Sequence, residues 1–147
     1  MHDFKNFPEL TNSQFEMYYF SSPHKQIVRD FRAKVINVHD ADTVTLRWTE
    51  RNFDFPIRFL DINAPELSEE RGNEARDWLK RRIEGNEVDI KMNRENRVDK
   101  WGRLLGDVHF NGISCGDEML RNRIVTKFDQ RKEGKIPSPN EVIPKWF

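Results

Sequence analysis

An alternation of apolar and polar residues between positions 29 and 59 is the feature that most restricts the fold of this chain. Apolar side chains take every second position in three successive segments: 31–35, 44–48 and 53–59. A period of two puts the apolar side chains of each segment on one face of a β-strand. Short polar stretches at 39–42 and 50–52 separate the segments. We therefore predict three consecutive antiparallel strands that bury one face.

The following half of the chain switches between helical and strand patterns. Apolar residues with helical spacing cover 75–83, and Gly85 is predicted to end that helix. Alternation returns at 88–92 and at 104–113, and a short helix is predicted near 117–123. This order of elements predicts an α+β fold, a five-stranded OB-type β-barrel with flanking helices.

Both ends of the chain differ from this central part. Residues 11–14 (TNSQ) fit a capping box, which predicts a short helix that ends near Pro23. Glycine and prolines after residue 128 predict an irregular tail, in which Trp146 and Phe147 are candidates for contact with the body. We therefore divide the chain into an N-terminal helical extension (1–28), an OB-type domain (29–128) and an irregular C-terminal tail (129–147).

Composition excludes several classes of protein. The 25 Lys and Arg residues balance 25 Asp and Glu residues, which argues against a nucleic-acid binder that works through bulk positive charge. One cysteine excludes an internal disulfide framework and a thiolate zinc cluster. The chain lacks an apolar run of about 18 residues, which argues against a membrane span and a membrane partner. Acidic residues interrupt the apolar stretch that an N-terminal signal peptide would need, so we expect a cytoplasmic protein. We also expect it to be a monomer.

Three clusters of charged residues carry the candidate chemistry. They are 40–43 (DADT), Arg58 with 61–66 (DINAPE), and 99–103 (DKWGR). The acidic stretch 61–77 contrasts with a basic stretch at 121–147, a pattern that suits a site for a cation and a phosphate together. Taken alone, the charges are explained better by an ordinary mixed surface.

Taken together, the clusters resemble the staphylococcal nuclease-like (thermonuclease) family over residues 29–128. The matching pieces are 38–44 (VHDADTV), 57–60 (IRFL), 64–66 (APE), 72–75 (GNEA) and 99–103 (DKWGR). The family has an OB-type barrel with helices, in agreement with the strand pattern. The resemblance implies calcium-dependent hydrolysis of phosphodiester bonds in DNA and RNA.

The resemblance also implies a metal site. Asp42 would bind Ca²⁺ directly, and Ala64 would offer its backbone carbonyl. Asn63 stands where the family has an aspartate, so its amide oxygen would bring no charge and we expect weaker calcium binding or a changed metal preference. Asp61 compensates only if the strand stays regular, because side chains two apart then share a face.

For the reaction itself, the resemblance implies that Glu66 is the general base for the attacking water. Arg58 and Arg103 would clamp the phosphate, since guanidinium groups bind phosphate oxygens bidentately. Lys100 and Trp101 would contact the substrate, with Trp101 either stacking on a base or packing at the rim. Arg123 falls where the family tends to have a glycine at a helix end, so we expect that end to differ.

Two alternative functions remain open. In the first alternative, the chain binds nucleic acid or protein and has lost catalysis, which Asn63 and the zero net charge would suggest. Alternatively, 65–66 (PE) followed by 89–91 (DIK) matches the loose pattern of restriction-type magnesium nucleases, with Glu66 and Asp89 on the metal and Lys91 beside the water. The retained arginines and base favour the calcium-dependent nuclease.

Overall fold

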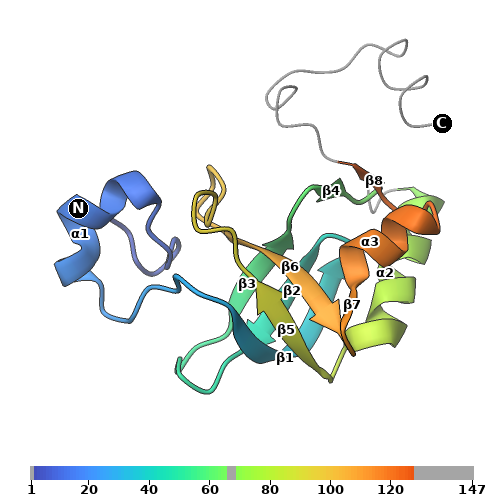
Figure 1. The fold of residues 1–147 in the computed structure, drawn as a ribbon, viewed down its shortest axis with the longest axis horizontal. Helices are drawn as coiled ribbons and strands as arrows, with labels where there is room; N and C mark the ends of the chain where they lie inside the picture. The colour runs from blue at the N-terminus through green and yellow to red at the C-terminus, as the bar shows by residue number, and fades with distance from the viewer. Residues whose placement is uncertain (1, 66–68, 128–147) are drawn as a thin grey trace, which may run out of the picture.

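Five strands close a β-barrel in the computed structural model, which describes residues 2–65 and 69–127 (Figure 1). They are β1 (Phe31–Asp40), β2 (Thr43–Arg47), β3 (Phe55–Phe59), β5 (Glu87–Lys91) and β6 (Leu104–Phe110). Their order is β3-β2-β1-β5-β6, and a parallel pairing of β3 with β6 closes the ring. The predicted α+β fold with a five-stranded OB-type barrel is confirmed.

The barrel is filled by the side chains that the alternation assigned to its inner face. In β3, Phe55, Ile57 and Phe59 are buried, whereas Arg58 is only half-buried. Gly106 in β6 shows how tight the filling is, because a Cβ there would lie 2.6 Å from the Ile90 side chain and 2.7 Å from that of Ile57. A larger residue at this point would push the two walls of the barrel apart.

Helix α2 (Glu70–Ile83) packs against β1 with the face that the helical spacing predicts. Its buried residues include Ala75, Leu79 and Ile83. The chain then turns at Gly85, whose φ of +82° is a backbone conformation that glycine adopts without strain. The helix and its end therefore follow the sequence prediction.

Helix α3 (Cys115–Arg121) follows a tight turn and the short strand β7 (Ile113–Ser114). The Ser114 hydroxyl accepts the Asp117 N–H at 3.2 Å and caps the helix. Cys115 is buried at the helix start, and burial raises the pKa of its thiol to about 12. A thiol held protonated in this way is a packing group rather than a nucleophile.

The end of α3 has the backbone geometry of a glycine-capped helix although Arg123 stands there, so the expected difference is not found. The Arg123 N–H donates to the Leu120 carbonyl at 3.1 Å, and the Ile124 N–H donates to the Met119 carbonyl at 2.9 Å. This Schellman pattern needs a left-handed residue, and Arg123 adopts φ +58°.

We therefore expect Arg123→Gly to raise the free energy of unfolding by about 0.5–1 kcal/mol, because glycine has no Cβ to strain there. Urea denaturation of the two proteins measures the difference. Arg121→Gly, inside the helix, is the matched control and should destabilise by about 1 kcal/mol. Stabilisation by both changes or by neither would contradict the explanation.

The sequence analysis did not predict two very short strands. β4 (Ile62–Asn63) pairs antiparallel with β8 (Thr126–Lys127). A strand of two residues has no period to detect, so only the folded chain reveals the pairing. The pairing fixes the backbone around Asn63 against the segment that follows α3.

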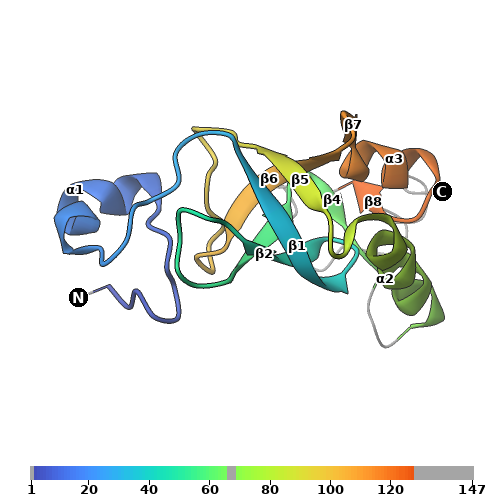
Figure 2. The ribbon, with the colours of Figure 1, turned by 90° about the horizontal axis from the view of Figure 1, so that it is seen from below.

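The N-terminal extension is less regular than the predicted helix. It contains η1 (Asn12–Gln14), α1 (Phe15–Tyr18) and η2 (Tyr19–Ser21), two 3₁₀ turns around one α-turn. The predicted capping box forms between Thr11 and Gln14, and in it the Thr11 N–H donates to Gln14 Oε1 at 3.0 Å. The extension lies at the end of the barrel opposite to α2 and α3 (Figures 1 and 2).

A buried charge cluster attaches the extension to the barrel. Glu9 is 2% exposed, and the side chains of Arg51 and Arg97 are also buried. Glu9 Oε1 lies 2.5 Å from Arg51 Nη1, and Glu9 Oε2 lies 3.7 Å from Arg97 Nη2. Arg97 donates to the Ile27 carbonyl at 2.8 Å and to the Leu10 carbonyl at 3.0 Å. We call Glu9, Arg51 and Arg97 the Glu9 cluster. It joins three segments that are far apart in the sequence.

The tail predicted at 129–147, with Trp146 and Phe147, lies outside the described residues. Among the residues described, no helix has the length and apolar character needed to cross a membrane.

Candidate active site

Asp42 stands in the turn between β1 and β2, as the first charged cluster indicated. Its Oδ2 accepts the Ala64 N–H at 2.8 Å and lies 3.5 Å from Arg58 Nη2. Its Oδ1 accepts the Thr43 hydroxyl at 3.0 Å. The tight β1–β2 turn and the end of β3 therefore bring Asp42, Arg58 and Ala64 together, three of the residues that the resemblance selected.

Arg58 holds the chain that follows β3. Its Nη1 donates to the Phe59 carbonyl at 2.9 Å and to the Ile62 carbonyl at 3.0 Å. Its Nη2 donates to Asn63 Oδ1 at 2.7 Å. The guanidinium thus shapes residues 59–63 and orients the Asn63 amide, in addition to carrying a positive charge beside Asp42.

Asp40 is a member of this site that the residue-by-residue assignment left out. Its Oδ1 accepts the Asp42 N–H at 3.0 Å. Burial, followed by the neighbouring Asp42 carboxylate, raises the pKa of Asp40 to about 7. Burial alone would also raise the pKa of Asp42, but hydrogen bonds from Asp40 and the Ala64 N–H and the charge of Arg58 hold it below its usual range. The signal in the sequence was the spacing of two aspartates in one turn.

This group of side chains has the chemistry of a cation site. Two neighbouring carboxylates, one of them forced toward its protonated form, are stabilised by a divalent ion, and oxygen donors are the ligands that Ca²⁺ prefers. Within 2–65 and 69–127, no group of three or more His, Cys, Asp or Glu side chains is arranged around a common point. The carboxylates of the described residues therefore do not complete a metal site by themselves, and a cation beside Asp40 and Asp42 would need further oxygen ligands from amide, carbonyl, water or phosphate groups.

The third cluster forms a compact loop before β6. Asp99 Oδ1 accepts the N–H groups of Trp101 and Arg103 at 2.9 and 2.8 Å, and its Oδ2 accepts Arg103 Nε at 2.7 Å. Lys100 Nζ lies 4.6 Å from the centre of the Trp101 ring, and the Arg103 guanidinium carbon lies 5.4 Å from it. Two cations thus flank an indole that is 56% exposed, which suits contact with a nucleotide.

Of the two arginines that the resemblance selected, Arg58 lies on β3 and Arg103 comes directly before β6, the strand that pairs with β3. In the parallel pairing of β3 with β6, Arg58 is opposite Leu105, two residues after Arg103. The described residues show no contact between the two guanidinium groups, and Arg103 is paired with Asp99 instead.

The N-terminal extension packs on this loop. Phe7 covers Gly102, where a Cβ would lie 2.9 Å from Phe7 Cδ1, and Gly102 has φ +82°. Both the left-handed backbone and the close approach explain why glycine separates Trp101 from Arg103. Sequence reasoning missed this contact, because nothing in the pattern around Phe7 points to residue 102.

Other sequence predictions receive different placements. Glu66, the general base of the resemblance, lies outside the described residues. Asp61 is exposed with φ +62°, so the strand regularity that would place it beside Asn63 is broken. Asp89 in β5 pairs with Arg32 at 3.2 Å, and Lys91 is exposed on the same strand. β6 separates β5 from β3 on that side of the barrel, away from Arg58.

Comparison with known proteins adds an independent finding. The family model described as "Staphylococcal nuclease homologue" matches residues 56–137, more than half of the chain. A probable staphylococcal-like nuclease of Oryza sativa subsp. japonica is 30% identical over 82 residues, which cover 54% of this chain and 24% of that protein. A micrococcal nuclease of Shigella flexneri is 34% identical over 80 residues, 54% of this chain and 43% of that protein. An uncharacterized endonuclease of Escherichia coli is 26% identical over 115 residues, 78% of this chain and 71% of that protein.

The chain therefore spans less than half the length of the rice and Shigella relatives, and more than two thirds of the Escherichia coli one. The family match begins at residue 56, so it includes Arg58, Asn63 and Arg103 and leaves Asp40 and Asp42 to the structure.

Proposed function

Since this chain belongs to the staphylococcal nuclease homologue family, we propose that it is a nuclease that hydrolyses phosphodiester bonds of DNA, RNA or both. The observation that carries the proposal is the meeting of Asp40, Asp42 and Arg58 at one end of β3. Paired carboxylates beside a guanidinium supply a place for a cation and a place for a phosphate within one small site.

Asp42, the Asn63 amide oxygen and the Ala64 carbonyl are the groups that we propose would hold calcium. A bound calcium ion supplies charge neutralisation of the phosphate and Lewis acidity. Arg58 donates to Asn63 Oδ1 at 2.7 Å. To bind calcium, this amide oxygen would have to give up the guanidinium for the ion. Because Asn63 brings no charge, the proposed site should bind calcium less tightly than one with a second aspartate there.

The chain's other groups act on the water and the phosphate. We propose Glu66 as the general base, since a carboxylate one residue from Pro65 enters the same segment as Asn63 and Ala64. Arg58 from β3 and Arg103 from the end of the loop before β6 stabilise the charge that develops on the phosphate oxygens. Lys100 and Trp101 contact the adjoining nucleotide.

One observation favours a second candidate, a nucleic-acid binding module without catalysis. The residue in the second metal position is an amide, and its oxygen is already engaged by Arg58. This candidate keeps the arginines and the exposed Trp101 as binding groups and needs no general base.

An assay of acid-soluble nucleotide release separates the two candidates. Single-stranded DNA, duplex DNA and RNA are incubated with Ca²⁺, Mg²⁺, Mn²⁺ or EDTA, and Arg58→Ala protein purified in parallel controls for contaminating nuclease. We expect cleavage that requires a divalent metal and is lost in the variant. A folded wild-type protein that binds the oligonucleotides but cleaves none under any metal would establish the binding module instead.

A further inference from the structure

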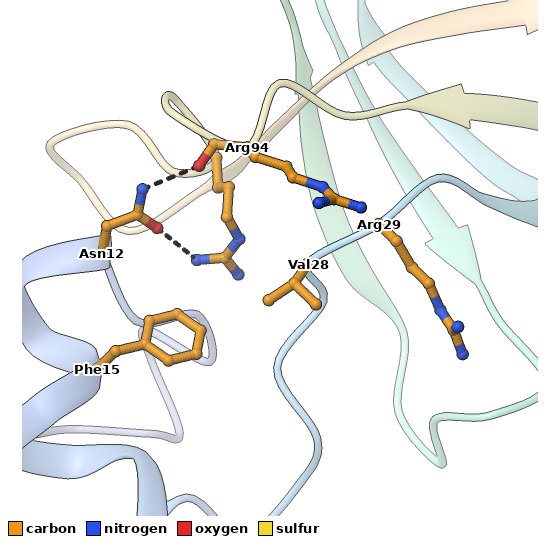
Figure 3. Close-up of a pocket in the computed structure, with 6 residues that line it drawn as sticks. Asn12, Phe15, Val28, Arg29 and Arg94 are labelled. Carbon is orange, nitrogen blue, oxygen red and sulfur yellow. Dashed lines mark hydrogen bonds between the residues drawn. The ribbon is translucent and has the colours of Figure 1, made fainter.

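A pocket away from the candidate active site lies between the N-terminal extension and the loop before β6. It has a volume of about 470 Å³ and is lined by Asn12, Phe15, Val28, Arg29, Arg94 and Arg97 (Figure 3). We call it the Arg29–Arg94 pocket. An adjoining hollow of about 520 Å³ is lined by Arg29, Asp30, Met92 and Arg94. The two hollows share Arg29 and Arg94, so these cations stand at their common border.

The three arginines of the pocket differ in their partners. Arg97 belongs to the Glu9 cluster, and its charge is offset there. Arg29 and Arg94 are exposed, and neither forms an ion pair within the described parts of the chain. Asp30, an acid that lines the adjoining hollow, accepts the Met92 N–H, so the two guanidinium groups outnumber the carboxylate and leave a net positive charge where the hollows meet.

The walls of the pocket limit the kind of ligand. Tyr19 stacks on Phe15 with ring centroids 5.3 Å apart, and the Arg97 guanidinium carbon lies 4.9 Å from the Phe15 centroid. Because Tyr19 and Arg97 already contact the ring, a stacked base is not the favoured ligand. In Figure 3, Phe15 and Val28 point toward each other, and the Arg94 side chain reaches toward residues 28–29. An anion with a small apolar part, such as a sugar phosphate, matches this lining.

Two hydrogen bonds from Asn12 and Arg97 hold the wall of the pocket that the extension contributes. The Asn12 side-chain amide donates to the Arg94 carbonyl at 2.9 Å, and Arg97 Nη1 donates to Asn12 Oδ1 at 3.3 Å. The loop from residue 92 to 103 therefore presents Arg94 at its beginning and Lys100, Trp101 and Arg103 at its end. One loop thus carries cations of both the pocket and the candidate active site.

We propose that the Arg29–Arg94 pocket is a second contact for single-stranded nucleic acid, in which both arginines bind a backbone phosphate of the strand that occupies the active site. This inference rests on the proposed function, because it takes its ligand from the substrate of that site. OB-type barrels commonly contact about 4–16 nucleotides, so a phosphate contact several nucleotides from the reacting bond is in keeping with the fold. The pocket extends the bound strand toward the N-terminal extension.

Equilibrium binding of labelled single-stranded DNA in EDTA tests the pocket without any cleavage. Fluorescence anisotropy is measured over a range of salt concentrations for wild type, Arg29→Ala, Arg94→Ala and Arg94→Lys, with a 3-mer and a 15-mer. Arg81→Ala, which removes an exposed arginine of α2 at the other end of the barrel, is the matched control for lost charge.

For the 15-mer, we expect weaker binding by Arg29→Ala and Arg94→Ala, with a plot of log K against log salt that is shallower by about 0.7 for a lost phosphate contact. Arg94→Lys should keep most of the slope, and the 3-mer should bind all variants alike. If Arg29→Ala and Arg94→Ala match Arg81→Ala for the 15-mer, the pocket is not a strand contact. An equal loss for both lengths would place the arginines in the active site and also overturn the proposal.

The outcome is distinguishable from a failure of the proposed function. Cleavage by the wild-type protein in the metal assay tests the reaction, whereas the anisotropy series tests the pocket in EDTA. A protein that cleaves but shows no length-dependent effect of Arg94 retains its function and loses the second contact. A protein that shows the effect but does not cleave retains the contact as a binding module.

Discussion

Replacing Arg58 with alanine should slow phosphodiester hydrolysis by a factor of about 10²–10³, the cost of removing one preorganised donor from a developing oxyanion. In the structure this guanidinium stands beside Asp42 and Asn63 and is held by two backbone carbonyls. Its position is therefore set before substrate arrives, which is the condition for strong electrostatic stabilisation. Initial rates at saturating metal and a range of substrate concentrations give the change in kcat and KM.

Arg58 also has a structural task, so the experiment must separate the two. Alanine leaves the carbonyls of Phe59 and Ile62 without their donor, at a cost of about 1–3 kcal/mol if they remain buried. Rates are therefore compared well below the unfolding midpoint of each protein, determined by urea denaturation. The matched control is Arg47→Ala. It removes an exposed arginine of β2 that pairs with Asp54, and it should keep the wild-type rate.

Arg58→Lys sharpens the interpretation. Lysine keeps the charge but lacks the planar fork that binds phosphate oxygens in pairs, so we expect most of the rate loss to remain. A kcat close to wild type in folded Arg58→Ala protein would remove Arg58 from the reaction and leave it only the task of holding residues 59–63.

Replacing Glu9 with glutamine should lower the free energy of unfolding by about 3–5 kcal/mol, the usual cost of removing one partner from a buried ion pair. Glutamine has nearly the same shape, so the change tests charge rather than packing. Burial lowers the pKa of Arg97 from its ordinary value, but the group remains charged and needs a counter-charge. Arg51 and Arg97 would both lose theirs.

The geometry of the Glu9 cluster explains why the loss should be large. Neither carboxylate oxygen of Glu9 accepts a well-aligned hydrogen bond among the described residues. Glu9 is therefore attracted to the two buried arginines mainly by Coulomb forces between opposite charges. Urea denaturation followed by tryptophan fluorescence measures the stability. Glu16→Gln, an exposed acid of the same extension, should change it by less than about 0.5 kcal/mol. Equal midpoints for the two variants would show that the cluster does not hold the extension.

The same cluster connects the extension to the loop that carries Trp101 and Arg103. Arg97 begins the segment that returns to β6, and its carbonyl accepts the Leu105 N–H at 2.8 Å. Phe7 covers Gly102 in the same loop. A residue as distant in the sequence as Glu9 therefore supports the placement of the candidate substrate-binding groups.

Most of the barrel was predictable because its signal is local. Strands such as β1 and β3 bury alternate side chains, and the helix α2 buries residues at helical spacing, so each pattern is complete within one segment. The residues of the candidate site were assigned by the resemblance to a known family and not by periodicity. They lie in short motifs, and Asp42, Arg58, Asn63 and Ala64 do meet in the structure.

Other features had no local signal. β4 and β8 are too short to show a period, and the helix predicted in the extension is broken into turns. The sequence marked Glu9, Arg51 and Arg97 only as charged residues, yet all three are buried. Charged residues are rarely buried, so pattern reasoning places them on the surface unless a partner is known.

The sequence by itself therefore determined the strands and the main helix, because these depend on spacing within a few residues, and its short motifs carried the resemblance that selected the candidate site. Only the tertiary structure decided that Asp42 meets Arg58, that Phe7 covers Gly102 and that Arg29 stands near Arg94. Such contacts join segments whose separation along the chain carries no information about their distance in space. They arise when the barrel closes and brings its turns, its loop and the extension together.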